Sequence, residues 1–454
     1  IAPQPTSPSR RLPTIHRLLW ALLRFDKQGT MSEKIRISDL GDPQLSDLQK
    51  MARDYGESLS LDMSAASILD DASRRTGLDD FGSMDFVGRL EMWLDEVAQD
   101  PDRLGIGNLS LRNSCVRYSA NRLLTQDLLR RHPEIHDIKI ERPIIIVGLP
   151  RTGTTHLLNV LSADERLRSM PLWESYEPIP MSNQAAHSDG IDPRYTRCAK
   201  EWEQMQMVTP HIALMHPMDP DHVHEEIELM LPDFSSYNLE WVARCPQWRD
   251  YYLSQDQTPH YEYMHTMLKV MTFLRPRNRW ILKSPQHFEQ IGPLMKTFPD
   301  AKIVMTHRDP VSVIQSAATM MTYAASMAYR TIDPGWYIDY WTDRIEKLLT
   351  AAVRDLHLIP AGQRFDVQFD EFMSDDQKMI DRVFDFAGHS LDEHASQQIE
   401  ERLKARSRDG QATVVYDVRA DFNREPRDIR ERFQSYIETF NVAFGSRPKG
   451  KKKV

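Results

Sequence analysis

A glycine-containing turn at residues 148–155, with the sequence GLPRTGTT, has the residue types that bind an anion. It follows an apolar run and opens a segment of helical character, so successive backbone N–H groups and the positive end of a helix dipole would surround a phosphate. Arg151 can hold one phosphate through parallel hydrogen bonds, and Thr154 and Thr155 can donate hydroxyl groups. The sequence therefore predicts a phosphate site at this turn.

The turn differs from a nucleoside triphosphatase loop at one position. Its glycine spacing is that of a Walker A motif, but Thr154 stands where the motif requires lysine. Without that lysine the charge bridge to a γ-phosphate is lost, which favours a ligand with a shorter phosphate chain. A P-loop kinase or hydrolase and a catalytically inactive nucleotide-binding module are the alternative functions.

A second basic segment begins at His307 and continues as Arg308-Asp309-Pro310. It also follows an apolar run, and Pro310 suits the first position of a helix. Ser316 would then lie about two turns along that helix, so a ligand that reaches both Arg308 and Ser316 would run beside it. This predicts a second anion site, whereas the alternative interpretation of Arg308-Asp309 is a local ion pair.

Four apolar runs are predicted to be the strands that position these turns: residues 142–148, 279–282, 301–305 and 365–369. Helical patterns fill the intervals, as at 317–329 and 341–356. Alternating strands and helices indicate an α/β fold, with a mostly parallel sheet flanked by helices and ligands at the carboxyl ends of the strands.

The organisation of the chain is predicted in four segments. Residues 1–30 are expected to be a disordered leader or an added extension, and 31–139 a helical N-terminal region. Residues 140–375 form the α/β core, with a helical insertion at about 195–275. Residues 376–454 are helical and end in a basic tail, to which no role is assigned.

Three amphipathic patterns indicate helices within the N-terminal region. The first is expected to start at Asp42-Pro43, with the aspartate as N-cap and the proline at the first helical position. The other two cover residues 84–97 and 110–131.

The composition excludes several classes of partner and cofactor. The 57 basic and 66 acidic residues give a net charge of −9, which argues against nucleic acid as a partner. The three cysteines provide neither a disulfide framework nor a zinc spacing, so a reducing cytoplasm is expected. The early apolar run at 18–23 is too short for a transmembrane segment. The His- and acid-rich stretch 219–226 matches no metal motif and is interpreted as an acidic helix start, so no metal is expected.

The two phosphate blocks together resemble those of the sulfotransferase superfamily, especially the bacterial branch that is similar to protein-tyrosine sulfotransferases. The resemblance covers roughly residues 140–375 and implies a P-loop-like sheet that works without a metal. It implies 3′-phosphoadenylyl sulfate (PAPS) as the donor substrate. The residues expected to hold the 5′-phosphosulfate are Arg151, Thr152, Gly153, Thr154 and Thr155, and those expected to hold the 3′-phosphate are Arg308 and Ser316.

The resemblance also implies a mechanism. In the tyrosine and heparan branches a glutamate beyond the phosphate turn is the base, and Glu174 occupies that interval. The family places a lysine near the bridging oxygen, which here is Lys283, and Arg151 would stabilise the same charge. The small-molecule branch has a histidine base where this chain has Pro285, so His287 is the alternative base.

The expected reaction is in-line transfer of a sulfuryl group from PAPS to a hydroxyl of an unidentified small-molecule, glycan or lipid acceptor. Residues 202–273 are rich in Met, Trp and Tyr and are predicted to form much of the acceptor wall, although each side chain alone equally suits ordinary packing. The residues in question are Met205, Met207, Trp241, Trp248, Tyr251, Tyr252, Tyr261 and Tyr263.

Overall fold

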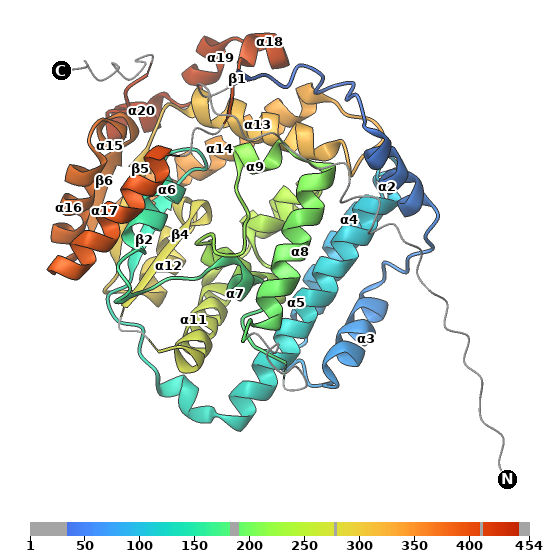
Figure 1. The fold of residues 1–454 in the computed structure, drawn as a ribbon, viewed down its shortest axis with the longest axis horizontal. Coiled ribbons are helices and arrows are strands. Elements are labelled where there is room, and N and C mark those ends of the chain that lie inside the picture. The colour runs from blue at the N-terminus through green and yellow to red at the C-terminus, as the bar shows by residue number, and fades with distance from the viewer. Residues whose placement is uncertain (1–33, 182–189, 277–278, 409–411, 445–454) are drawn as a thin grey trace.

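A computed structural model describes residues 34–181, 190–276, 279–408 and 412–444 (Figure 1). The expected leader at 1–30 and the basic tail lie outside these residues. The main sheet has five parallel strands in the order β3-β4-β2-β5-β6. Their bounds are β2 Ile144–Gly148, β3 Leu167–Arg168, β4 Arg279–Ser284, β5 Lys302–His307 and β6 Arg364–Gln368.

The sheet confirms the predicted α/β class. Each of the four predicted runs became a strand of this sheet, and its fifth strand, the two-residue β3, was not predicted, because so short a strand leaves no pattern in the sequence. The register sets Ile146 of β2 opposite Lys283 of β4, and Gly148 opposite Thr306 of β5. The carboxyl ends of these three strands are therefore level with one another at one edge of the sheet.

Helices cover both faces of the sheet, and β2 supplies apolar side chains to each. Ile145 and Val147 belong to the core shared with α11, α12, α13 and α14, whereas Ile144 and Ile146 belong to the core shared with α6, α16 and α17. Alternate residues of a strand point to opposite faces, so a strand buried on both sides must be apolar throughout. The bounds are α6 Thr154–Leu161, α11 Thr258–Leu274, α12 Ile291–Thr297, α13 Pro310–Ala325, α14 Pro334–Asp355, α16 Asp376–Ala387 and α17 Glu393–Arg408.

The N-terminal helices lie on the side of the molecule away from the sheet, in blue and cyan in Figure 1. They are α2 Asp47–Glu57, α3 Ala65–Thr76, α4 Phe86–Ala98 and α5 Gly105–Arg131, followed by the 3₁₀ helix η1 Pro133–Asp137. A separate two-stranded sheet pairs β1 Lys34–Ile35 in parallel with β7 Thr413–Val414.

The prediction that the first helix starts at Asp42-Pro43 is wrong. Helix α2 starts at Asp47, and its N-cap is Ser46, whose hydroxyl accepts a hydrogen bond from the Gln49 backbone N–H. The Gln49 side chain in turn accepts from the Ser46 backbone, at 2.8 Å. This reciprocal pair satisfies two N–H groups at the helix start, which the Asp42-Pro43 position does not offer.

Short helices connect β3 to β4 across the expected insertion. They are α7 Leu172–Tyr176, α8 Pro193–Val208, α9 Ile212–Met215, η2 Glu226–Asp233, η3 Tyr237–Trp241 and α10 Pro246–Ser254, which lead into α11. The C-terminal part contains α15 Phe369–Ser374, α18 Val418–Phe422, α19 Pro426–Glu431 and α20 Gln434–Phe440. Two further 3₁₀ helices are η4 Pro285–Phe288 and η5 Leu356–Leu358. The division of the chain into four segments stays a prediction.

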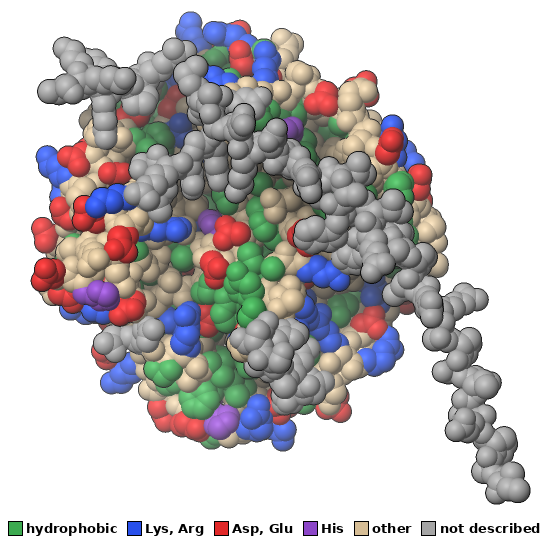
Figure 2. All heavy atoms as spheres, viewed as in Figure 1, with side chains coloured by type: hydrophobic (Ala, Val, Ile, Leu, Met, Phe, Trp, Pro, Cys, Tyr) green, Lys and Arg blue, Asp and Glu red, His purple; other side chains and the backbone are tan. Residues whose placement is uncertain are grey.

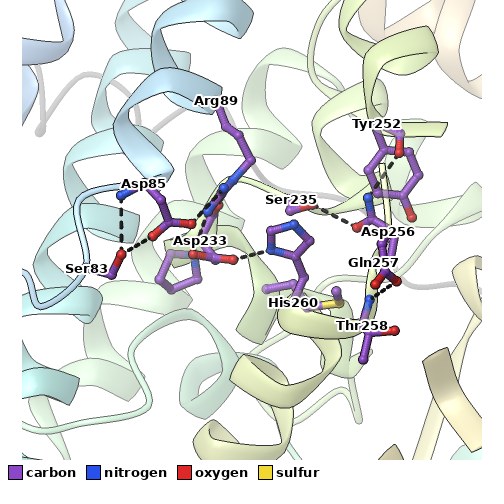
Figure 3. Close-up of polar contacts among 12 residues, drawn as sticks. Ser83, Asp85, Arg89, Asp233, Ser235, Tyr252, Asp256, Gln257, Thr258 and His260 are labelled. Carbon is purple, nitrogen blue, oxygen red and sulfur yellow. Dashed lines mark hydrogen bonds and ion pairs between the residues drawn. The ribbon is translucent and has the colours of Figure 1, made fainter. Parts of the chain in front are cut away.

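A buried carboxylate joins the N-terminal helices to the rest of the molecule (Figure 3). Asp233, at the end of η2, accepts hydrogen bonds from Arg89 of α4 and Arg122 of α5, each at 2.8 Å. Its second oxygen contacts Nδ1 of His260 on α11. Asp233 and Arg122 are 5% and 6% exposed, and Asp233 is the carboxylate that pairs with Arg122, whereas Arg89 also pairs with Asp85 at 2.9 Å.

Replacing Asp233 by alanine is expected to lower the free energy of unfolding by about 3–5 kcal/mol, because it leaves the buried Arg122 charge without a carboxylate partner. Urea unfolding of both proteins measures the loss. Asp256→Ala is the control, since this exposed carboxylate only accepts from the Thr258 backbone N–H. Equal losses in the two variants would contradict the role given to Asp233.

Candidate functional site

The backbone of the turn between β2 and α6 is shaped to surround an anion. Arg151 and Gly153 have positive φ angles of 68° and 84°. Left-handed residues in such a turn make neighbouring N–H groups converge, and a non-glycine residue adopts this conformation at an energetic cost that functional sites commonly bear. Gly148 is required for close packing, because a Cβ there would collide with Thr306 Oγ1 and lie 2.6 Å from Thr154 Cγ2.

The threonines of the turn have two different roles. Thr152 is buried and donates to the Leu149 carbonyl at 2.6 Å, and its hydroxyl lies 2.7 Å from that of Thr306. It therefore supports the turn from beneath. Thr154 and Thr155 form the first turn of α6 and line the main cavity, as does Gly153.

Two arginines from neighbouring strand ends line this same cavity. Arg151 donates to the Met215 carbonyl, and Arg308 donates to the carbonyl of Arg151 while its guanidinium carbon lies 3.9 Å from the centre of the Phe369 ring. Burial and the neighbouring Arg151 charge lower the pKa of Arg308 from its usual 12.5. Two cations held this close in a partly buried place favour an anion beside them.

The chain around Arg308 fixes its position. The alternative of a local ion pair with Asp309 does not describe the structure, because the Asp309 carboxylate caps α13 and pairs with Arg430 at 2.8 Å. His307 is wholly buried, and its ring nitrogens lie 3.0 Å from the Tyr436 hydroxyl and 2.9 Å from Asp366 Oδ1. Thus β6 and α20 both hold the end of β5.

Ser316 lies on α13, as predicted, but it is not among the residues that line the cavity. Its side chain is buried, and its hydroxyl has no hydrogen-bond partner among the described residues. A buried hydroxyl without a partner is costly, so it marks a place where a ligand atom or water would be stabilising.

Lys283 lies at the end of β4 and lines the cavity. Its ammonium contacts the Glu225 carboxylate, and its backbone N–H donates to Glu226 Oε2 at 2.7 Å. The adjacent acidic residues therefore fix both ends of this lysine. The stretch 219–226 was expected to start a helix, but only its last residue, Glu226, is helical, as the first residue of the 3₁₀ helix η2.

The two predicted bases occupy buried networks instead of the cavity wall. Glu174 is 4% exposed and is held by Arg168, at 2.6 and 3.0 Å, and by Arg275, at 2.7 Å. His287 is wholly buried, with its nitrogens 2.7 Å from the Tyr261 hydroxyl and 2.6 Å from Glu226 Oε1. Neither residue is among those that line the cavity.

The cavity has a volume of about 1810 Å³ and extends from the turn toward the N-terminal helices. Side chains from α5, α8, α9, α13 and α14 close around it, and in Figure 1 α8 lies between the sheet and α5. On the face shown in Figure 2, hydrophobic side chains reach the surface between acidic and basic ones. The apolar lining includes Met205, Met215, Trp241, Met320, Met321 and Trp336.

Four histidines that were not predicted as site residues line the same cavity: His156 of α6, and His216, His222 and His224. The ring centres of His216, His222 and His224 lie 5.9 to 6.4 Å apart. Burial, followed by the effect of His224, lowers the pKa of His222 to about 3. Burial also lowers the pKa of His216 well below its usual value, so both of these rings are neutral at pH 7. The only signal in the sequence was the His- and acid-rich stretch 219–226.

The model of a family described as the sulfotransferase family matches residues 143–393, more than half of the chain. The chain belongs to the sulfotransferase family. The resemblance predicted from the two phosphate blocks is thereby confirmed.

Relatives of this sulfotransferase occur in mycobacteria. Omega-hydroxy-beta-dihydromenaquinone-9 sulfotransferase Stf3 of Mycobacterium bovis is 23% identical over 289 residues, which cover 62% of this chain and 70% of the relative. Sulfotransferase STF9 from Mycobacterium avium has a similar fold, with a TM-score of 0.76, 23% identity, and coverage of 86% of this chain and 100% of that one. STF1 from Mycobacterium tuberculosis H37Rv gives a TM-score of 0.69 at 23% identity, covering 83% and 99%.

Only part of the predicted acceptor wall of this sulfotransferase lines the cavity. Met205 and Trp241 do, whereas Trp248 and Tyr252 stack on each other at 5.3 Å within a buried cluster below α4 and α5. Tyr261 is wholly buried against His287. Most of the aromatic side chains in 202–273 therefore pack in the core. Much of the cavity wall comes instead from α5, α13 and α14, which were not predicted to contribute to it.

In the part of this sulfotransferase that the structure describes, no helix is long and apolar enough to cross a membrane. In the same part of the chain, no group of three or more His, Cys, Asp or Glu side chains is arranged to hold a metal ion.

Gly148→Ala is expected to destabilise this sulfotransferase by about 1–3 kcal/mol, because the added methyl must displace Thr306 or the phosphate turn. Gly88→Ala is the matched control: it lies in the exposed interior of α4 with open space around its Cα, and should stabilise the protein by about 0.5–1 kcal/mol. Thermal unfolding of the two variants measures both changes. A neutral Gly148→Ala variant would show that the turn tolerates a side chain there.

Proposed function

We propose that this sulfotransferase transfers a sulfuryl group from PAPS to the hydroxyl of an apolar acceptor. The observation that carries the proposal is the pair of guanidinium groups, Arg151 and Arg308, which line one cavity at adjacent strand ends and donate only to backbone carbonyls among the described hydrogen bonds. An anion with two separated phosphate groups matches two such cations.

The donor would bind along the edge of the sheet. Its 5′-phosphosulfate accepts hydrogen bonds from the N–H groups of the turn, from the hydroxyls of Thr154 and Thr155, and from Arg151. Its 3′-phosphate takes Arg308 and Ser316, and the unpartnered hydroxyl of Ser316 supports this assignment. The absence of a Walker lysine agrees with a donor whose reacting group is sulfate and not a γ-phosphate.

In the transfer step, charge accumulates on the equatorial and bridging oxygens. Lys283 and Arg151 line the wall on the side of the phosphate turn and would stabilise that charge, an effect of about 3 kcal/mol for a well-placed donor. For Lys283 to act, its ammonium must exchange Glu225 for the donor oxygen. The assignment of Glu174 as base stays a prediction, and its two arginine partners disfavour it because they hold the carboxylate away from the cavity.

The acceptor that suits the cavity is a small apolar molecule or a lipid that carries a hydroxyl. The methionine and tryptophan side chains of the wall can adapt to an elongated apolar group, and the named mycobacterial relative acts on a menaquinone alcohol. A cytoplasmic location stays a prediction, supported by three buried cysteines that are free thiols.

Arg308→Ala should weaken the binding of adenosine 3′,5′-bisphosphate roughly 10- to 100-fold, about 1.5–3 kcal/mol, because it removes a charged hydrogen-bond donor from the 3′-phosphate. Isothermal titration calorimetry measures the affinity. Arg427→Ala serves as control, since Arg427 is highly exposed on α19. If wild type does not bind the bisphosphate, or Arg308→Ala binds it equally well, the donor assignment is wrong.

Transfer itself is tested with ³⁵S-labelled PAPS and a panel of farnesol, hexadecan-1-ol and 2-naphthol. We expect a labelled product from at least one apolar alcohol, without a requirement for magnesium, because the charges at the turn come from the protein. ATP with magnesium is the comparison substrate. Magnesium-dependent turnover of ATP, with no transfer of label, would favour the kinase or hydrolase alternative.

A further inference from the structure

His224 and Glu228 form a hydrogen-bonded pair in the wall of the cavity. His224 Nε2 lies 3.2 Å from Glu228 Oε1, and the same carboxylate oxygen accepts from Asn238 at 2.8 Å. A carboxylate only accepts hydrogen bonds, so Nε2 carries the proton of the neutral ring and Nδ1 then presents a lone pair. That Nδ1 atom is buried and has no hydrogen-bond partner among the described residues.

The backbone places this imidazole in the wall of the cavity that Lys283 also lines. The segment around Val223 is extended and forms an antiparallel bridge with Pro171, in which the His224 N–H donates to the Met170 carbonyl at 2.8 Å. His222 and His224 therefore lie on the same side of an extended segment. The next residue is Glu225, whose carboxylate contacts the Lys283 ammonium, so the extended segment is held beside the end of β4.

The other candidate bases are less suited to accept a proton from a ligand in the cavity. His222, with a pKa of about 3, is too weak a base, and the pKa of His216 is also lowered well below its usual value. The nitrogens of His287 both have buried partners, and Glu174 is enclosed by two arginines. His224 alone among these groups combines a place in the cavity wall, an orienting carboxylate and an unpartnered nitrogen.

We propose that His224, oriented by Glu228, is the general base that accepts the proton of the acceptor hydroxyl. This inference rests on the proposed function. The acceptor oxygen forms a bond to the donor sulfur while the bond from sulfur to the 5′-phosphate oxygen breaks, and the electron pair of that bond stays on the phosphate. The hydroxyl proton moves to His224 Nδ1, the products are a sulfate ester and adenosine 3′,5′-bisphosphate, and the imidazolium then releases its proton to water.

The test is a set of single-turnover rates with ³⁵S-labelled PAPS and either farnesol or 2-naphthol. His224→Gln should slow transfer to farnesol by about 10²–10³-fold, the usual contribution of a positioned base, while its affinity for adenosine 3′,5′-bisphosphate stays unchanged. Transfer to 2-naphthol should fall less, because a phenol loses its proton more readily. His265→Gln is the matched control, since His265 lies on α11 against Phe298 and not in the cavity wall.

Two further readouts separate a base from a merely structural residue. Added imidazole should restore part of the rate of His224→Ala. The groups that face the His224 ring are Glu228 of η2, Tyr176 of α7, and the neighbouring rings of His216 and His222, and all of them remain in this variant. Glu228→Gln should transfer more slowly than wild type, because the carboxylate that orients the ring is lost.

The results distinguish a failure of the His224 proposal from a failure of the proposed sulfotransferase function. If Glu174→Gln loses transfer while His224→Gln keeps the wild-type rate, the carboxylate is the base and the inference is overturned with the sulfotransferase function intact. If wild type binds the bisphosphate but accepts neither alcohol, ¹⁵N NMR of the histidines gives the answer. The resonance lost in His224→Gln must show the Nε2–H tautomer, and an Nδ1–H tautomer would overturn the inference.

Discussion

Parallel strand pairing is the constraint on which the site depends. The carboxyl ends of β2, β4 and β5 are level, so the residues that follow or end them, Arg151, Lys283 and Arg308, must share one edge of the sheet. Gathering three cations in this way is unfavourable without an anion, and burial makes it more so. Two sets of contacts from other elements offset this unfavourable energy. Glu225 neutralises Lys283, and His307 links the end of β5 to β6 and α20 through Asp366 and Tyr436.

The strands and the phosphate turn could be predicted from the sequence because their signals are local. A strand buried on both faces has to be a continuous apolar run, as in 144–147, and a turn that approaches Thr306 closely has to begin with Gly148. These patterns need no knowledge of distant residues. Ser46 shows how such local signals also mislead, since a capping box a few residues later outcompeted the Asp42-Pro43 start.

The proposed base could not be predicted in the same way, because the surroundings of each candidate depend on residues far along the chain. Glu174 is paired with Arg275, which is 101 residues away, and the sequence around Glu174 contains no pattern that predicts this pair. The histidines come together only because the extended segment at 222–224 bridges to Pro171 and returns the chain beside Lys283. Proximity of this kind is a product of tertiary packing, which single-sequence patterns do not encode.

The apolar wall has its own buried support. Arg344 of α14 is wholly buried and donates to Glu240 of η3, at 2.8 and 2.9 Å, and to Glu289, at 2.6 Å. These pairs hold η3 against α14, where Trp241 and Trp341 lie 4.0 Å apart. Helices α5, α13 and α14 supply much of this wall but no residue of the turn at 148–153. Side chains of these helices that line the wall, such as Met320 and Trp336, can therefore change while the turn between β2 and α6 keeps its sequence, so the apolar part of the cavity and the turn can evolve separately.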